Sequence, residues 1–217
     1  MNIVFNWAYF GYLLQGAVWT LVLTACAFVL GGAAGFVVML GRTARARWVR
    51  LATLAYVEVI QGTPLLVLLF IAYFGLGIFG IEVPPLVAAA LSLMINASAF
   101  LGEIWKGCVD AVPRTQREAA ECLALTRWQG FKDVILPQAA RIATPPTVGF
   151  MVQLLKNTSL ASVVGFVELT RAAQVINNST IQPFLVFGIA GAIYFLLCYP
   201  LTAWSRSLER TLNVGRR

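Results

Sequence analysis

The feature that most constrains this chain is a series of long stretches without a charged residue. Such stretches cover residues 16–41, 59–81 and 83–102, and each is long enough to cross a bilayer as a helix, which takes about 20 residues. Apolar residues make up 59% of the 217 residues, and the mean hydropathy is +0.80. A soluble core cannot bury that much apolar surface, so the chain is predicted to be an integral membrane protein.

Two further stretches bring the prediction to five spans. Residues 142–155 form a short stretch that ends at Lys156, and residues 172–205 form a long one. The spans are expected at about 16–41, 62–81, 84–102, 143–165 and 184–204. Residues 1–15 are rich in aromatic side chains, which is typical of a segment at headgroup level rather than a sixth span. The expected fold is an all-α, polytopic bundle, with residues 1–217 as one transmembrane domain.

Basic residues gather on one predicted side of the membrane. Of sixteen Lys and Arg residues, only Lys156 and Arg171 lie elsewhere. The other fourteen follow the first, third or last span: Arg42, Arg45, Arg47, Arg50, Lys106, Arg114, Arg117, Arg127, Lys132, Arg141, Arg206, Arg210, Arg216 and Arg217. The positive-inside rule makes that side cytoplasmic, with the N-terminus outside and the C-terminus inside. Topology therefore accounts for the net charge of +7, and no nucleic-acid partner is expected.

Catalysis by this chain is not expected. It contains no histidine, which excludes Ser-His-Asp and Cys-His catalysis and histidine zinc sites. Its four cysteines are far apart in sequence, so neither a metal site nor a disulfide framework is indicated. No GxxxxGK[ST] phosphate loop occurs either, so the chain is not expected to bind ATP itself.

The loop between the third and fourth spans, residues 113–138, carries two helix-start signatures. Thr115 with Glu118 and Thr126 with Gln129 both have the spacing of a capping box, in which the two side chains satisfy free backbone N–H groups. The loop is therefore predicted to form two short helices rather than a flexible connection.

Pro113 and Pro137 are expected to bound this helix pair, and the two helices are expected to meet near Leu125. The first helix has a smooth face of small and apolar residues at helical spacing: Ala119, Ala120, Leu123 and Ala124. Such a pair suits docking into a groove of another protein. Patterning alone leaves open the alternative that it caps the membrane bundle.

The order Glu118-Ala119-Ala120, then Ala124, Val134 and Leu136-Pro137, resembles the EAA loop of ABC importer permeases. The chain departs from that pattern at Ala124 and at Thr115, where the family usually has glycine. The resemblance implies that the loop docks onto an ATPase subunit. The implied docking residues are Glu118, Ala119, Ala120, Leu123, Ala124, Leu136 and Pro137.

The resemblance covers essentially the whole chain and points to the polar amino acid subfamily of these permeases. The matching segments are Gly16, Thr20 and Thr24; Gly62-Thr63-Pro64-Leu65-Leu66; Ala99 to Gly107; Val134 to Ala139; Leu155 to Leu160; and Glu168-Leu169. Gln61 replaces a usual arginine, and Val148-Gly149-Phe150 stands where Gly-Asn-Glu is common.

The resemblance implies a transport subunit, not an enzyme, in the bacterial inner membrane. Its implied partners are two ABC ATPase subunits that bind ATP and Mg, a second identical or sister permease, and an extracytoplasmic solute-binding protein. The implied solute is a polar amino acid. A secondary transporter or channel would also be polytopic, but it would need no long loop with capped helices.

The polar interruption after residue 155 is predicted to line the solute path. Lys156 would attract a carboxylate, and Asn157 and Ser159 would bond amino or amide groups; Glu168 is the fourth residue predicted on this path. Charge inside a membrane usually faces a cavity or a partner. The alternative is that Lys156 reaches a headgroup or pairs with Glu168 or Glu103.

Three other features are interpreted as structural. Gly31, Gly32 and Gly35 form a small-residue step on the first span, which is typical of a close helix contact. Glu58 and Glu103 fall at predicted cytoplasmic ends of spans, where a carboxylate reaches water.

Overall fold

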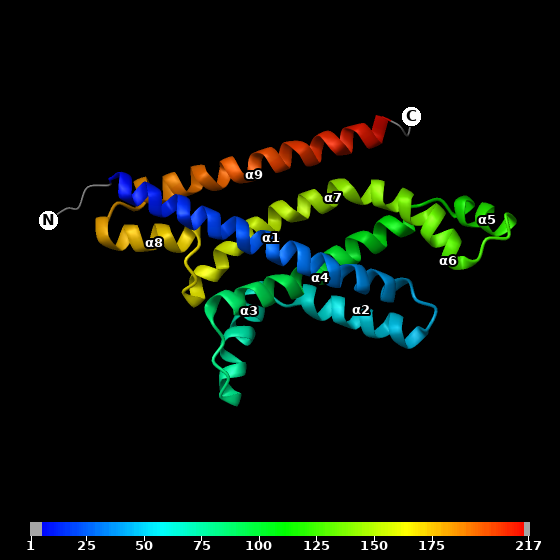
Figure 1. Cartoon of the computed structure of the whole chain (residues 1–217), viewed down its shortest axis with the longest axis horizontal. Helices are drawn as coiled ribbons and strands as arrows, with labels where there is room; N and C mark the ends of the chain where they lie inside the picture. Colours follow the sequence, from blue (N-terminus) through cyan, green and yellow to red (C-terminus); the bar gives the residue numbers. More distant parts are fainter. Residues whose placement is uncertain (1–5, 215–217) are drawn as a thin grey trace.

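A computed structural model describes residues 6–214. Within them the chain is entirely helical, as predicted, and Figure 1 shows the helices gathered into an elongated bundle. In chain order the elements are α1 (Trp7–Thr43), α2 (Arg47–Gly62), α3 (Leu65–Phe74), the 3-10 helix η1 (Leu76–Phe79), α4 (Pro85–Asp110), α5 (Arg114–Cys122), α6 (Arg127–Gln129), the π-helix η2 (Gly130–Ile135), α7 (Leu136–Asn157), the 3-10 helix η3 (Thr158–Val164), α8 (Leu169–Thr180) and α9 (Pro183–Val214).

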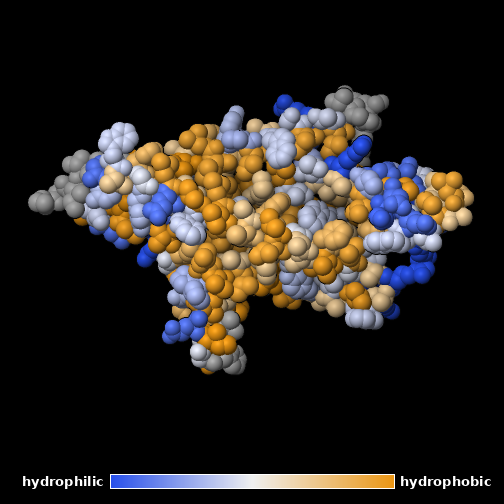
Figure 2. All heavy atoms as spheres, viewed as in Figure 1, coloured by the Kyte–Doolittle hydropathy of each residue, from blue (hydrophilic) through white to orange (hydrophobic). Residues whose placement is uncertain are grey.

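In the described part of the chain, α1, α4 and α9 are each long and apolar enough to cross a membrane, and two bent helix pairs bring the possible spans to five. The pairs are α2 with α3, and the helical run from Arg127 to Val164 with α8. Figure 2 shows apolar side chains over the middle of the bundle, and hydrophilic ones gathered toward the end that carries α5. This distribution fits a helix bundle set in a bilayer.

Helix α1 begins earlier than the first span predicted from the sequence. Asn6 caps it by accepting a hydrogen bond from the backbone N–H of Tyr9, so residues 7–15 are its first turns rather than a separate segment. Residues 1–5 of that predicted segment lie outside the described residues. A helix of 37 residues is about 55 Å long, whereas the hydrocarbon core is about 30 Å thick. The aromatic end of α1 can therefore still lie at headgroup level.

The second predicted span, residues 62–81, is not one continuous helix: it holds the ten-residue α3 and the 3-10 helix η1, and it begins at a sharp bend after α2. Helices α2 and α3 meet at an angle of 99°, and α3 projects from the bundle as a side arm (Figure 1). The break lies at Thr63-Pro64, where Thr63 is extended and Pro64, with φ −55° and ψ 134°, is not helical. Proline disfavours a helical conformation in the residue before it, so a helix that reaches Thr63 ends there.

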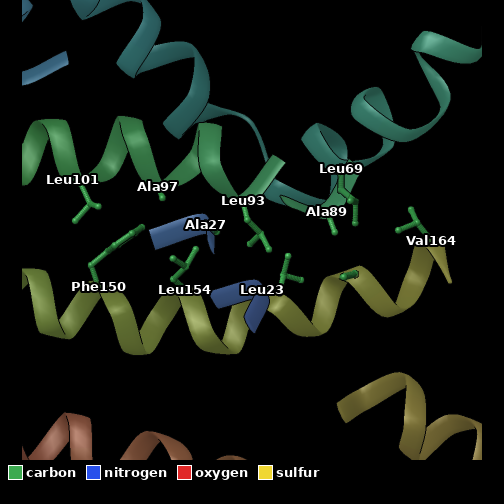
Figure 3. Close-up of a cluster of buried hydrophobic side chains, with 11 residues drawn as sticks. Leu23, Ala27, Leu69, Ala89, Leu93, Ala97, Leu101, Phe150, Leu154 and Val164 are labelled. Carbon is green, nitrogen blue, oxygen red and sulfur yellow. The ribbon is translucent and has the colours of Figure 1, made fainter. Parts of the chain in front are cut away.

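The core lies where α1, α3, α4, α7 and η3 meet, as Figure 3 shows. Its buried members are Leu23, Ala27, Leu69, Ala89, Leu93, Ala97, Leu101, Phe150, Leu154, Ala161 and Val164. Glycines bring α1 close to α4, as predicted: a Cβ on Gly31 would lie 2.6 Å from the Cβ of Ala97, and one on Gly35 would lie 3.0 Å from the carbonyl oxygen of Ser98. Gly32 has more room, since its nearest neighbour would be Trp105 at 3.6 Å.

The basic residues gather at one end of the bundle. The α1–α2 turn, the α5–α6 loop and the C-terminal half of α9 share that end, whereas α8 and the start of α1 share the other (Figure 1). Arg216 and Arg217 lie outside the described residues. The arrangement brings together the groups on which the predicted orientation depends, and the orientation itself stays a prediction.

Candidate docking loop and solute path

Helix α5 starts at Arg114, directly after Pro113. Proline has a fixed φ and no N–H to leave unsatisfied, so it suits this boundary. Thr115 therefore lies inside the first turn, and no side chain caps the helix. The predicted capping box of Thr115 with Glu118 is wrong, because the preceding proline already sets where the helix begins.

The end of α5 is closed by backbone hydrogen bonds alone. The N–H of Ala124 donates to the carbonyl of Glu121 at 2.9 Å, and the N–H of Leu125 donates to that of Ala120 at 3.1 Å. This pair of bonds is the Schellman motif, in which one residue takes a left-handed conformation. Ala124 does so with φ 54°, a conformation that costs a non-glycine residue about 1–2 kcal/mol. The family's usual glycine at this position is thereby explained.

The second predicted helix start is confirmed. The hydroxyl of Thr126 accepts from the N–H of Gln129 at 3.3 Å, and the side chain of Gln129 accepts from the N–H of Thr126 at 2.9 Å. Both halves of the capping box are therefore formed. The two short helices are joined by residues 123–126, which include Leu125, as predicted.

Pro137 does not end the second helix, contrary to the prediction. From Arg127 the chain stays helical through η2 and on through α7. The widened π turn of η2 shifts the bonding so that the N–H of Leu136 donates to the carbonyl of Phe131. Pro137 follows at the start of the new helical register, in the first turn of α7, where its missing N–H does least harm.

Most of the predicted docking residues in and after α5 are exposed. Glu118, Ala119, Leu123 and Ala124 are exposed, and Leu123 is 74% exposed. Ala120 is buried on the inner side, where a Cβ on Gly130 would lie 3.4 Å from it. Leu136 is half-buried and Pro137 exposed, both at the start of α7. A docking role for each stays a prediction.

Hydrogen bonds tie α5 to two long helices. The Nη2 of Arg117 donates to the carbonyl of Val109 in α4 at 3.1 Å. The Nε2 of Gln138 in α7 donates to the Oε1 of Gln116 at 3.2 Å. A displacement of α5 would therefore act directly on both helices.

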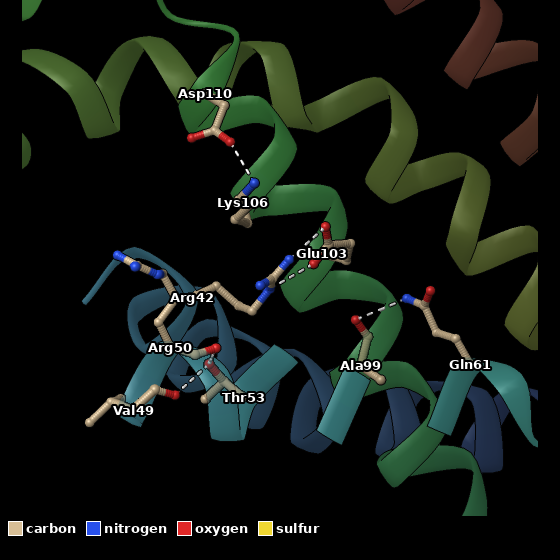
Figure 4. Close-up of polar contacts among 9 residues, drawn as sticks. All are labelled: Arg42, Val49, Arg50, Thr53, Gln61, Ala99, Glu103, Lys106 and Asp110. Carbon is tan, nitrogen blue, oxygen red and sulfur yellow. Dashed lines mark hydrogen bonds and ion pairs between the residues drawn. The ribbon is translucent and has the colours of Figure 1, made fainter. Parts of the chain in front are cut away.

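Close to the loop, an ion pair joins α1 to α4, as Figure 4 shows. Arg42 reaches both carboxylate oxygens of Glu103, at 3.0 and 3.2 Å. The structural interpretation of Glu103 is confirmed, and Glu103 is not the partner of Lys156. Gln61, which stands where the family usually has arginine, donates to the carbonyl of Ala99 at 3.4 Å.

The predicted path residues lie at the junction of α7 and η3. Lys156 is exposed, and no carboxylate pairs with it among residues 6–214. Asn157 is half-buried, and the hydroxyl of Ser159 donates to the carbonyl of Lys156 at 2.8 Å. The helix that ends here has 22 residues, longer than the 14-residue stretch predicted, because Arg141 lies within it. The rise from Arg141 to Lys156 is still only about 22 Å, less than the hydrocarbon thickness.

Sequence reasoning missed that Lys156 belongs to an exposed stripe on α7. Pro146, Gly149, Gln153 and Lys156 follow one another at intervals of three or four residues, and all four are exposed. Residues at that spacing share one face of a helix. The spacing was visible in the sequence, but the side of α7 that packs inward was not.

Glu168 lies apart from this exposed stripe, buried with 0% exposure at the start of α8. Its carboxylate accepts from the N–H groups of Thr170 and Arg171 and from the hydroxyl of Tyr194, each at 2.8 Å. These donors occupy both oxygens, so Glu168 is not available to Lys156 or to solute in this conformation. Tyr194, which the sequence gave no reason to select, links this corner to α9.

A protein family described as "Binding-protein-dependent transport system inner membrane component" matches residues 27–214. The chain belongs to this family. It is thus a multi-pass inner-membrane component of a transport system, and the resemblance to ABC importer permeases is confirmed.

Individual relatives agree with this membership. The chain is 31% identical to "Probable amino-acid ABC transporter permease protein YckA" of Bacillus subtilis over 201 residues, 93% of this chain and 89% of that one. It is 34% identical to "L-cystine transport system permease protein TcyB" of the same organism, over 91% of this chain and 85% of that one. A solved chain from "Crystal structure of an amino acid ABC transporter with histidines" has a TM-score of 0.90 and 33% identity, over 96% of this chain and all of that one.

Proposed function

We propose that this chain is the permease subunit of an ATP-driven importer of polar amino acids. The observation that carries the proposal is the likeness over nearly the full chain to an amino acid ABC transporter, with a TM-score of 0.90 at 33% identity. The permeases named for amino acids and for L-cystine support the same class of solute.

In this proposal α5 is the coupling element. Two ATPase subunits, which bind ATP and Mg, dock against the exposed side chains of Glu118, Ala119 and Leu123. Closure of the ATPase pair then displaces α5, and the hydrogen bonds of Arg117 and Gln138 carry the displacement into α4 and α7. The end of the bundle with the basic residues is cytoplasmic, and the α8 end receives solute from a binding protein.

The solute path follows the exposed stripe of α7. A charged or amide side chain is costly against lipid, so Gln153 and Lys156 require a water-filled path or a second permease beside them. Two permeases facing each other across such a path would meet both needs. Lys156 would then attract the carboxylate that every amino acid carries, and Asn157 and Ser159 would contact its polar groups.

The experiment is ATP hydrolysis in lipid vesicles that contain this chain, its candidate ATPase and the binding protein. Each amino acid is added in turn, and the rate is compared with the rate without solute. Stimulation by one or a few polar amino acids is the expected result. A stable complex that no amino acid stimulates would refute the class of solute, and failure to form a complex would refute the role as permease.

The path is tested separately by uptake of the amino acid so identified. Lys156→Ala should lower uptake by about tenfold or more, since a hydrogen bond to a charged group contributes about 1.5–3 kcal/mol and about 1.4 kcal/mol is tenfold. Lys156→Arg keeps the charge and should retain most of the uptake. Equal uptake by wild type and Lys156→Ala, in complexes that assemble normally, would remove Lys156 from the path.

A further inference from the structure

A cavity of about 680 Å³ lies behind the docking loop, between the ends of α1 and α4 and the α5–α6 loop. The α1–α2 turn forms one wall through Ala44 and Arg45, and α5 forms another through Ala120 and Glu121. Its size is within the range of about 300–1,000 Å³ that holds small molecules. The α1–α2 turn and the α5–α6 loop, which line it, lie at the end of the bundle where the basic residues gather (Figure 1).

The cavity is positively charged. Five basic residues line it, Arg42, Arg45, Lys106, Arg117 and Arg127, against the acidic Asp110 and Glu121. Glu103 neutralises Arg42, and Asp110 neutralises Lys106 at 2.6 Å (Figure 4). Arg117 donates only to an uncharged backbone carbonyl. Within residues 6–214, neither Arg45 nor Arg127 has an ion pair or a side-chain hydrogen bond. Three guanidinium groups therefore face one carboxylate.

A second, apolar cavity of about 340 Å³ adjoins the first between α1, α4 and α7. Val109 lines both. Along α1, Phe36 and Met39 line the apolar cavity, and the basic cavity begins one residue later, at Leu40. The order is the same from η2 into α7: Ile135, the last residue of η2, lines the basic cavity, and Leu136 and Ala139 of α7 line the apolar one. The apolar cavity therefore lies on the membrane side of the basic one.

We propose that these two cavities together bind a phospholipid with an anionic headgroup. The phosphate would lie between Arg45 and Arg127, and an acyl chain would follow the apolar cavity along α7. Basic pockets between helices on the cytoplasmic side of a membrane suit anionic headgroups. A free phosphate would use the arginines but leave the apolar cavity unexplained, which is why the adjacent pair favours a lipid.

The position of this site gives the lipid a consequence for the transporter. Ala120 and Leu125 line the basic cavity from the loop, whereas Leu123 faces outward. A bound lipid would thus support the docking helix from behind while the ATPase contacts its front. The proposed lipid site involves no transported solute, so lipid binding can be measured independently of the proposed transport function.

The test is native mass spectrometry of the full-length chain in detergent, titrated with phosphatidylglycerol, with phosphatidylcholine of the same acyl chains, or with inorganic phosphate. We expect one phosphatidylglycerol to be retained per chain, in preference to phosphatidylcholine. Arg45→Gln with Arg127→Gln should weaken retention on the order of 30-fold, since each basic residue contributes about 1 kcal/mol to an anionic lipid and about 1.4 kcal/mol is tenfold. Ala140→Phe, which fills the apolar cavity from an exposed position, should weaken lipid binding as well.

The matched control is Arg206→Gln with Arg210→Gln, which removes the same charge from exposed positions at the same end of the bundle. It should leave retention within about twofold of wild type. Equal losses in both double variants would overturn the site. Equal retention of phosphatidylcholine, or retention of inorganic phosphate with no lipid, would overturn the assignment to an anionic lipid.

Discussion

Two helix ends in this molecule satisfy their free backbone groups in different ways, the C-terminal end of α5 through backbone hydrogen bonds and the N-terminal end of α8 through a side chain. At Ala124 the chain leaves α5 through a turn closed by backbone hydrogen bonds, and the nearby side chains of Glu118 and Leu123 stay exposed. At Glu168 the chain enters α8 through a turn closed by a buried carboxylate with three donors. The turn at Ala124 therefore leaves the nearby side chains free to contact a partner, whereas the turn at Glu168 uses its side chain to stabilise the fold.

The difference predicts where substitutions should affect stability and where they should affect assembly. In the Glu168 corner and in the α1–α4 contact, stability should depend on single side chains. In the docking loop it should depend on backbone conformation, and exposed side chains should matter only when the ATPase is present.

The largest effect is expected for Glu168→Ala. It leaves two backbone N–H groups and the hydroxyl of Tyr194 without their acceptor in a buried corner, which should lower stability by about 3–5 kcal/mol. Thermal unfolding of the purified chain in detergent measures the loss. Glu168→Gln keeps one acceptor oxygen and should lose clearly less. Unchanged unfolding of Glu168→Ala would contradict the structural role of this corner.

A smaller loss, about 2 kcal/mol, is expected for Gly31→Ala, because the added Cβ would lie 2.6 Å from the Cβ of Ala97. The neighbouring Gly32→Ala is the control, since its Cβ meets nothing nearer than Trp105 at 3.6 Å. It should be neutral or slightly stabilising, as alanine favours helix. The same thermal unfolding experiment compares them, and equal melting temperatures would refute the close contact of α1 and α4.

Ala124→Gly should stabilise the docking loop by about 1 kcal/mol, because glycine accepts the left-handed conformation without strain. Hydrogen exchange of the α5 amides measures the change as slower exchange. Ala119→Gly places the same substitution inside α5 and should instead destabilise the helix by about 1 kcal/mol. If both variants shifted hydrogen exchange of α5 in the same direction, the left-handed strain inferred at Ala124 would be contradicted.

The smallest effect on stability, within about 0.5 kcal/mol, is expected for Leu123→Ala, because the side chain is 74% exposed. Its effect should appear in the complex, as weaker co-purification of the ATPase and less stimulated ATP hydrolysis. Leu196→Ala, at a leucine that is 68% exposed on α9, should change neither. Normal docking of Leu123→Ala would exclude Leu123 from the docking surface.

Much of the fold was accessible from the sequence because membrane spans leave a strong signal. Charge-free stretches predicted the long apolar helices α1, α4 and α9, and the Thr126 capping box was visible as a local pattern. The misses have local causes that only the three-dimensional context decides. Pro64 sits inside an apolar run yet turns the chain by 99°, and Pro113 overrides the capping pattern of Thr115.

The candidate site residues also fall into a group that could be predicted from the sequence and a group that could not. The two short helices of the docking loop could be predicted, since its residues are contiguous and their spacing is distinctive, and its docking role stays a prediction. The buried hydrogen bonds of Glu168 could not be predicted, because its partner Tyr194 lies on α9, 26 residues away. The stripe on α7 was hidden for a related reason: which side of a helix faces inward depends on neighbours that the sequence does not position.

The most direct test of the central claim is photo-crosslinking in native membranes, with a photoreactive amino acid at position 123 and, as the control, at Phe195, which is 62% exposed on α9. We predict that position 123 captures an ATPase subunit, identified by mass spectrometry, and that position 195 does not. Capture of the ATPase from both positions, or from neither, would contradict the assignment of α5 as the docking element.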